Sequence, residues 1–393
     1  MRSREKALVG VSAGSVGVGA SLGFFPGFLA TVLSEELGVS KGEVGLIVGI
    51  YFGATGIGSI LAGKITELYG PRKVIFADML AVATCSFLIA IIGTYEMWVI
   101  SSLVAGAAYG LTNTGTNVAI GKAISETQRT LAMSIKTAGV PFMATVASAI
   151  GPWSAGKWQW ENILVVNGIC ALVVGLATLV IIPDDDFELD KSRMVKALPQ
   201  KFYWFGIASF LLIAGSQPFY SWIVSYLEDS LDVTSGLAGA ITSIACFCGV
   251  IGMILNGLYA DRVGAKKRIQ LIMTLLFLSA IAIGFIILGI VLGIWIVLVG
   301  AIIGVTAQLA AIGTMHACVV DKAPFSVSRA TGVTMTGYYL GALASPALFG
   351  FVVDWTGSYT YPWSGTAVLL LAAVFAWFKA GKIETQLNLS KGE

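Results

Sequence analysis

Two sets of polar side chains stand out because each lies inside an otherwise apolar run. Lys136 follows Arg129 by seven residues, so it lies about 10 Å inside a helix that begins there. Tyr109, Asn113 and Asn117 recur every four residues and therefore share one helix face. A lysine in hydrocarbon is costly unless it snorkels, pairs or meets an anion. Snorkelling and anion attraction both fit the lysine; lining a wet cavity and hydrogen bonding to another helix both fit the stripe.

Enzyme chemistry is not indicated. His316 is the single histidine, and the chain has no serine–histidine–aspartate set, no phosphate-binding loop and no metal-type cysteine spacing. The pattern Gly17-x-Gly19 lies in an apolar helix, where glycine serves packing. We therefore predict no cofactor, no metal site and no nucleotide-driven pump. For His316, a hydrogen-bonded structural role and a proton relay both remain open.

The acidic residues near the apolar runs have structural interpretations. Glu43 lies three residues after Ser40, which predicts a capping box at the start of a helix. Asp78 follows the basic residues Arg72 and Lys73, and we expect it to pair with them near the membrane surface. No carboxylate is expected at the depth of the lone lysine, which therefore has no evident internal partner.

Composition places the chain in a membrane. It is 56% hydrophobic and 12% charged, a balance that a polytopic membrane protein needs and a soluble domain does not. Twelve apolar stretches of roughly 18 to 27 residues are each long enough to cross a bilayer. If both termini are cytoplasmic, 21 of the 24 lysines and arginines also fall on the cytoplasmic side. The positive-inside rule thus predicts this orientation.

One short charged turn occurs twice. Residues 63–73 read GKITELYGPRK, and residues 257–268, which begin 194 residues later, read GLYADRVGAKKR. The shared positions are Gly63, Glu67, Gly70, Arg72 and Lys73 in the first copy, and Gly257, Asp261, Gly264, Lys266 and Lys267 in the second. Glycines permit close helix approach and a tight reversal, and the acid can pair with cations or a helix N-terminus. We interpret the turns as a conformational gate.

The same offset relates other positions and predicts two homologous halves. Gly45 corresponds to Gly239, and Gly151-Pro152 with Gly156 to Ser345-Pro346 with Gly350. The predicted organisation is a first six-helix bundle at 1–182, a cytoplasmic linker at 183–201, a second six-helix bundle at 202–383 and a cytoplasmic tail at 384–393.

The doubled turn resembles the signature of the major facilitator superfamily of transporters. The segment 135–141, IKTAGVP, resembles a motif in bacterial members that include the cyanate-transporter-like and organic-anion groups. The resemblance implies an all-α membrane protein with twelve transmembrane helices in two pseudo-symmetric six-helix bundles. It also implies a central cavity lined by spans one, four, seven and ten, exposed to each side in turn by rocking of the halves. In that scheme the charged turns stabilise the outward-facing state. Ser102 stands where members often carry an arginine linked to proton coupling.

Candidate cavity residues come from these spans and from the span that carries the lone lysine. Pro26 and Pro218 interrupt corresponding spans, which points to the substrate path. The candidate substrate-binding residues are Lys136, Tyr109, Asn113, Asn117, Phe24, Gln217, Tyr220, Gln308 and Tyr338.

The combination of one buried cation with amide and tyrosine donors predicts transport of a small organic anion, most plausibly a carboxylate, across the cytoplasmic membrane. Proton symport is typical of the family, while uniport and anion exchange stay open. An antiporter that exports drugs or apolar metabolites is the alternative carrier, and a membrane sensor without transport is the alternative of another class. The expected partners are the substrate, protons and membrane lipid, with no nucleic acid, and the expected state is a monomer.

Overall fold

The computed structural model describes residues 2–157, 159–183 and 198–384, and within these ranges the regular elements are helices. The helices are α1 (Ser3–Phe28), α2 (Ala30–Leu37), α3 (Lys41–Ile92), α4 (Tyr95–Ala123), α5 (Glu126–Lys157), α6 (Glu161–Ile181), α7 (Tyr203–Leu231), α8 (Ser235–Val263), α9 (Ala265–Leu292), α10 (Ile294–Lys322), α11 (Val327–Thr356) and α12 (Thr360–Gly381). Most of the predicted linker (184–197) and tail (385–393) lies outside the described residues.

The number of membrane crossings agrees with the sequence. Ten described helices are long and apolar enough to span a bilayer. One of them, α3, has 52 residues and is kinked at Gly70 (φ 77°, ψ 154°), so it supplies two crossings. Helix α4 is not among the ten, although its 29 residues are long enough, because it carries the polar stripe. Together these give the twelve spans of the predicted all-α membrane fold.

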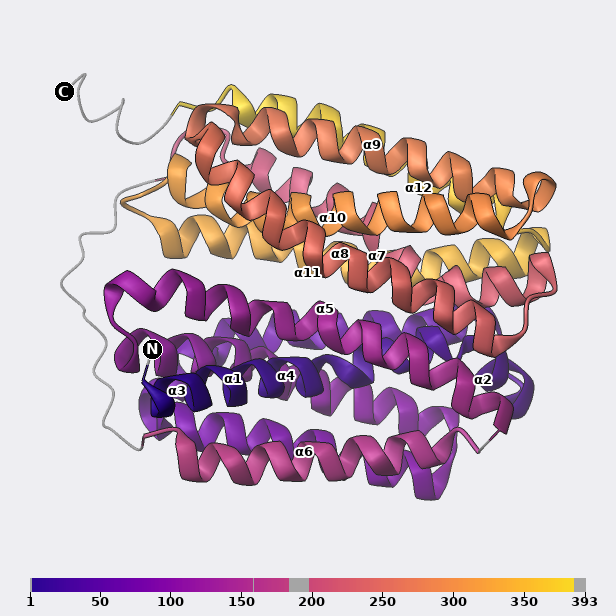
Figure 1. Cartoon of the computed structure of the whole chain (residues 1–393), viewed down its shortest axis with the longest axis horizontal. Helices are drawn as coiled ribbons and strands as arrows, with labels where there is room; N and C mark the ends of the chain where they lie inside the picture. The colour runs from indigo at the N-terminus through magenta and orange to yellow at the C-terminus, as the bar shows by residue number, and fades with distance from the viewer. Residues whose placement is uncertain (1, 158, 184–197, 385–393) are drawn as a thin grey trace.

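The helices form two bundles, α1–α6 and α7–α12, which lie one above the other in Figure 1. Helix α1 begins and α12 ends at the same end of the molecule (Figure 1). The two charged turns also lie there, and we call it the turn end. The opposite end, where α3 and α8 begin, is called the latch end.

The two bundles are related by a shift that changes along the chain. Gly45 and Gly239 are 194 residues apart, but the carbonyls they pack against belong to Pro346 and Ser148, which are 198 apart. Likewise, α10 begins and ends 199 residues after α4. Helix α9 is longer than the second part of α3, which displaces everything after it. The expected correspondence of Gly151-Pro152 with Ser345-Pro346 at a constant offset was therefore wrong.

The two halves are joined at the latch end. The backbone N–H groups of Lys41 and Gly42 donate to the two carboxylate oxygens of Asp354, at 3.1 and 2.7 Å. Lys41 Nζ also lies 2.5 Å from Asp229 Oδ2, which accepts a hydrogen bond from Tyr359. A carboxylate of one half thus caps a helix N-terminus of the other, where the helix dipole favours negative charge. The capping box predicted for Ser40 and Glu43 is present in the same helix start.

Glycines allow the helices to meet closely at this end. A Cβ at Gly42 would lie 2.1 Å from the ring of Phe351, and one at Gly45 would lie 2.3 Å from the Pro346 carbonyl oxygen. Gly63 and Gly257, at the turn end, have open space in place of a side chain. The two halves are consequently in direct contact at the latch end, whereas no atom lies within 4 Å of a Cβ built on either turn-end glycine.

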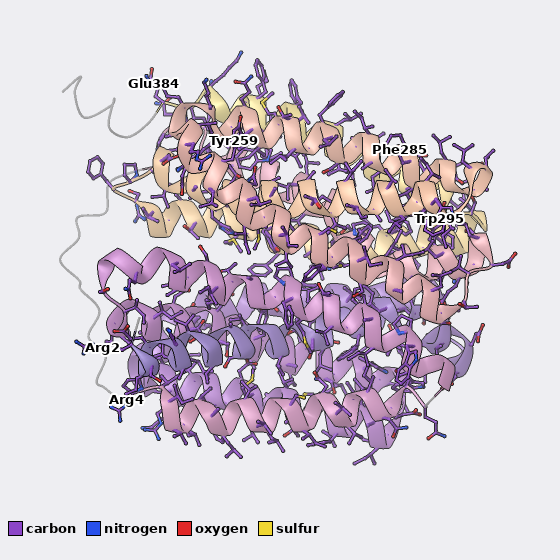
Figure 2. The ribbon with its side chains drawn as sticks, in the orientation of Figure 1. Arg2, Arg4, Tyr259, Phe285, Trp295 and Glu384 are labelled. Atoms are coloured by element: carbon purple, nitrogen blue, oxygen red, sulfur yellow. The ribbon has the colours of Figure 1, made fainter. Side chains whose placement is uncertain are left out.

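The outer surface is apolar around the bundle. Ile60, Val180, Val291 and Trp295 expose between 75% and 86% of their surface. Figure 2 shows side chains that extend outward along the helices, with Tyr259 and Trp295 on the second half and Arg2 and Arg4 at the turn end. Such a belt is the surface that hydrocarbon covers in a membrane.

Candidate functional site

Lys136 and the polar stripe of α4 come together. Lys136 is 3% exposed, and its ammonium group donates to Asn113 Oδ1 at 2.5 Å and to Asn117 Oδ1 at 3.0 Å. Among the described residues, no carboxylate pairs with it. Two amide oxygens satisfy donors but bring no negative charge, so the site keeps a net positive charge.

Helix α5 is placed for this contact by glycines. A Cβ at Gly17 would lie 2.7 Å from the carbonyl oxygen of Gly139, and one at Gly139 would lie 2.2 Å from that of Ala13. The backbones of α1 and α5 are therefore in direct contact one turn beyond Lys136. Because Lys136 is buried and its ammonium group is bonded to two side chains of α4, it does not extend to the headgroups, so the snorkelling interpretation was wrong.

Five aromatic rings from α1, α3, α4 and α7 lie together where the two halves meet. Phe24 of α1 lies 6.0 Å from Tyr220 of α7 and 6.1 Å from Phe52, measured between ring centroids. Tyr51 links this set to Tyr109, at 5.3 Å from Phe52 and 6.1 Å from Tyr109. We call these five rings the aromatic roof. Three of them were predicted as cavity residues, whereas Tyr51 and Phe52 were missed because the first part of α3 reads as an ordinary apolar span.

The second half supplies neutral polar groups. Gln217 and Gln308 are buried, and the amide nitrogen of each has no hydrogen-bond partner. The hydroxyl of Tyr220 is likewise buried without a partner. Tyr338 lies 5.3 Å from Tyr339, centroid to centroid, and both rings are partly exposed.

His316 of α10 is exposed and lies within electrostatic range of Lys136. None of the hydrogen bonds described for the chain involves its ring. Of the two roles left open for His316, the hydrogen-bonded structural one has no support among the described hydrogen bonds.

Asp78 departs from its expected place. It is 1% exposed, and neither carboxylate oxygen has a hydrogen-bond partner. It does not pair with Arg72 or Lys73, because it lies between α1 and α4, where Gly19 leaves room for it. Thr112, the residue before Asn113, is the side chain that interacts with it. The expectation that no carboxylate lies at the depth of Lys136 was therefore also wrong.

The charged turns show one expected feature and one that the sequence did not indicate. Gly70 and Gly264 both have positive φ, at 77° and 75°, and provide the reversals. In the second turn, however, Asp261 pairs with Arg268 at 2.8 Å, while Lys266 and Lys267 are exposed. Arg268 also binds Asp321 at the end of α10, at 2.9 Å. In the first turn, one carboxylate oxygen of Glu67 is buried without a partner and Lys73 is exposed.

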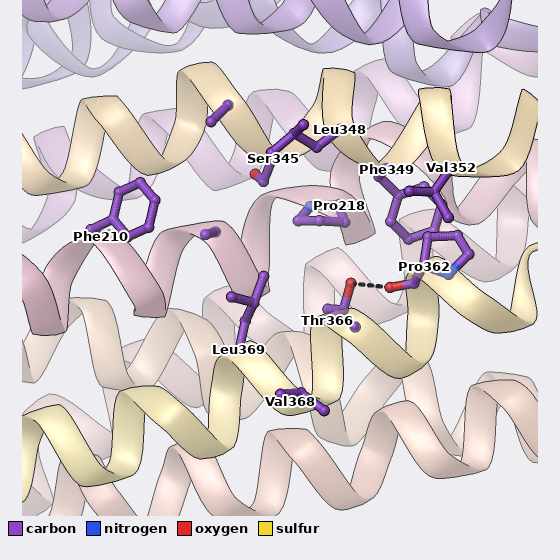
Figure 3. Close-up of a pocket in the computed structure, with 13 residues that line it drawn as sticks. Phe210, Pro218, Ser345, Leu348, Phe349, Val352, Pro362, Thr366, Val368 and Leu369 are labelled. Atoms are coloured by element: carbon purple, nitrogen blue, oxygen red, sulfur yellow. Dashed lines mark hydrogen bonds between the residues drawn. The ribbon is translucent and has the colours of Figure 1, made fainter. Parts of the chain in front are cut away.

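A separate apolar pocket of about 430 Å³ lies among α7, α11 and α12 (Figure 3). Phe210, Pro218, Leu348 and Phe349 line it, and the Thr366 hydroxyl in its wall is already bonded to the Pro362 carbonyl at 2.9 Å. Lys136 and its partners do not line this pocket. Without a charged lining group it does not compete with the central site for an anion.

Comparison with known sequences gives a consistent family. Residues 11–346 match the Major Facilitator Superfamily. The chain is 23% identical over 367 residues to the hexuronate transporter of Bacillus subtilis, with 84% of each chain covered. It is 22% identical to the gentisate transporter of Corynebacterium glutamicum, with 88% of this chain and 81% of the relative covered. It is 21% identical to a probable sulfoacetate transporter of Cupriavidus necator, with 88% and 87% covered.

Solved structures agree on the fold. A bacterial homologue of the human lysosomal transporter Spinster, in an inward-facing and unoccupied conformation, superposes with a TM-score of 0.78 at 12% identity, covering 97% of this chain and 98% of the other. A D-xylose–proton symporter gives a TM-score of 0.71 at 16% identity, covering 95% and 97%. With twelve spans in two bundles, a duplicated charged turn and a family match over most of its length, the chain belongs to the Major Facilitator Superfamily of transporters.

Proposed function

We propose that this protein is a proton-coupled carrier of a small organic anion, most simply a carboxylate. The observation that carries the proposal is the buried ammonium group of Lys136, which is held by two neutral amides and has no described carboxylate partner. An anion that enters the cavity would supply the missing charge. Hexuronate, gentisate and sulfoacetate, in the names of the relatives, are all organic anions.

The cavity offers contacts from both halves. Lys136, Asn113 and Asn117 belong to the first half, and His316, Gln217, Gln308, Tyr220 and Tyr338 to the second. An anion bound between them would draw the halves together around it, which is how a carrier couples occupancy to its change of conformation. The aromatic roof would contact the apolar part of the substrate.

The distribution of basic residues supports an orientation with the turn end on the cytoplasmic side of the inner membrane. In this orientation both termini are cytoplasmic, and the contact between the halves at the latch end supports an inward-facing conformation. In the outward-facing state the turn end closes, and the charged turns come against the opposite half. We propose that a monomer in the lipid bilayer carries out this cycle.

Uptake by purified protein in liposomes tests the assignment. Radiolabelled D-glucuronate and gentisate serve as probes, and an inward proton gradient is imposed. We expect uptake by the wild type and a loss of about 10-fold to 100-fold in Lys136→Gln, because a charge-assisted hydrogen bond contributes roughly 1.5–3 kcal/mol. Lys6→Gln, which changes an exposed lysine of the same half outside the charged turns, is the matched control and should leave uptake unchanged.

One observation favours a second function. The aromatic roof, with the unpaired hydroxyl of Tyr220, could also receive an apolar compound, as in an exporter. In that case Lys136→Gln would retain transport of a neutral aromatic probe while the wild type would fail to move either anion. That pair of results would replace the organic-anion assignment.

A further inference from the structure

Asp78 is a buried acid that takes no part in the anion site proposed above. Its side chain lies on the second part of α3 and is 1% exposed. Neither carboxylate oxygen has a partner at hydrogen-bond distance, and the Thr112 hydroxyl is the side-chain group placed to donate to it. An ionised carboxylate in such a place costs several kcal/mol more than a neutral acid. An ionisable group of this kind inside a membrane protein calls for a functional explanation.

Among the residues that the structure describes, no cation faces Asp78. From α1, Gly19 faces it with backbone only, and a Cβ there would lie 3.1 Å from Asp78 Oδ2 and 2.7 Å from the Tyr109 ring. From α4, Tyr109 and Thr112 face it, and the first part of α3 contributes Tyr51. Its own helix adds Cys85, about two turns away, and α6 packs beside it through Gly175 against Met79.

The backbone of α1 is held at the same point. The Tyr51 hydroxyl donates to the carbonyl oxygen of Gly19. The carboxyl group is therefore covered by a helix contact that depends on the absence of a side chain at Gly19. Water can reach it if α1 moves away from α4 or if the Tyr109 ring of α4 turns aside.

Asp78 of α3 and Lys136 of α5 both contact α4, and they do so at adjacent residues of that helix. Thr112 faces Asp78, and the next residue, Asn113, binds Lys136. The two charged groups do not pair with each other, so each can change its charge or its partner separately. Helix α4 is the element through which one can affect the other.

We propose that Asp78 is the proton-binding site of this carrier. When α1 and α4 separate, a hydronium ion from the aqueous phase gives its proton to the carboxylate and leaves as water. The proton stays bound when the helices close over the acid as they do in this conformation. Protonation of Asp78 favours the closed packing of α1 on α4. By linkage, the closed packing must in turn increase the affinity of Asp78 for the proton. The use of that proton to drive anion uptake rests on the function proposed above, whereas the proton site itself does not.

Asp78→Asn tests the site, because the amide has the shape of the acid but cannot titrate. The matched control is Asp232→Asn: Asp232 is exposed and has φ 51°, a conformation that asparagine accepts. Infrared difference spectra across a pH step, recorded on protein in lipid without substrate, detect the stretching band of a protonated buried carboxyl group. We expect the wild type and Asp232→Asn to show the band and Asp78→Asn to lack it. Wild-type protein without such a band, or the same band in Asp78→Asn, would overturn the proposal.

A second measurement separates this proposal from the assignment of the substrate. In liposomes, Asp78→Asn should keep exchange of D-glucuronate at equal pH but lose the gain in uptake from a proton gradient, by roughly tenfold. Gradient-driven uptake that survives in Asp78→Asn would overturn the proton site while leaving the carrier function intact. A wild type that shows the infrared band but moves neither glucuronate nor gentisate would retain the proton site and refute the organic-anion function. The conservative variant Asp78→Glu retains a carboxyl group, so it should keep a titrating band and guards against a folding defect in the amide variant.

Discussion

The first half carries ionisable groups in its core at places where the second half carries neutral ones. Through the charged turns the halves are offset by 194 residues, so Asp78 on α3 corresponds to Ile272 on α9. The contacts of α5 and α11 differ by 198, so Lys136 corresponds to Thr334, which is buried. Two bundles with one backbone plan thus have different interiors.

The helices that hold the lysine differ in the same way. Since α10 follows α4 by 199 residues, Asn113 corresponds to Ile312 and Asn117 to His316. The two amide side chains that hold Lys136 in the first half thus have no counterpart at these positions of the second half, which carry an isoleucine and a histidine. The difference teaches that the duplicated scaffold supplies rocking and close packing, while the binding chemistry resides mainly in one copy.

The largest expected effect comes from moving the cation to the other half. In Lys136→Thr combined with Thr334→Lys, the new lysine would lie near Ile312 and have no amide pair to hold it. We expect uptake of D-glucuronate to stay about 100-fold below wild type, because no amide oxygen would accept hydrogen bonds from the new ammonium group and its charge would be buried without a partner. Initial rates in liposomes, normalised to folded protein, measure this; recovery to near wild-type rates would show that the halves are interchangeable.

A methyl group at the α1 contact should test the close packing around the ionisable core of the first half. In Gly19→Ala the Cβ would meet the Tyr109 ring at 2.7 Å and Asp78 at 3.1 Å. We expect destabilisation of about 1–3 kcal/mol from overpacking, seen as a lower Tm in detergent. Gly10→Ala, where nothing lies within 4 Å, is the matched control and should leave the Tm near wild type. Equal Tm values for the two variants would contradict the close approach.

Removing the cap across the halves should shift the conformation. Asp354→Ala removes the acceptor of the Lys41 and Gly42 backbone N–H groups. A lost cap costs about 1 kcal/mol, so the population open at the latch end should rise by roughly fivefold. Spin labels at Gln159 and Tyr361, with the five native cysteines replaced, report this as a longer distance component in pulsed EPR. An unchanged distance distribution would mean that the cap does not stabilise the closed latch end.

The smallest effect is expected from His316→Gln. The histidine lies in range of Lys136 but is exposed and forms none of the described hydrogen bonds. We expect the KM for D-glucuronate to rise by about twofold to threefold with little change in Tm, because a single exposed hydrogen bond contributes roughly 0.5 kcal/mol. A loss as large as that of Lys136→Gln would make the two halves equal contributors to the anion site.

The sequence by itself determined the features that depend on neighbouring residues. Apolar length specified the twelve spans, glycine with an acid and two cations at fixed spacing specified the turns, and helical periodicity placed Asn113 and Asn117 on one face. These inferences succeed because a helix has the same geometry wherever it occurs, so spacing along the chain is enough.

Only the tertiary structure decided which distant groups meet. Lys136 binds Asn113 from 23 residues away, and Lys41 binds Asp354 from 313 residues away. From the sequence alone, a buried Asp78 looks the same as one that pairs with the basic turn at the membrane surface. The reason is that the backbone of α1 at Gly19 covers it, and no neighbour along α3 does. The repeated spacing of the turns also did not reveal that α9 is longer than the second part of α3. This extra length changes the offset between the halves for every later helix. Such contacts depend on how separate helices pack, which local periodicity does not encode.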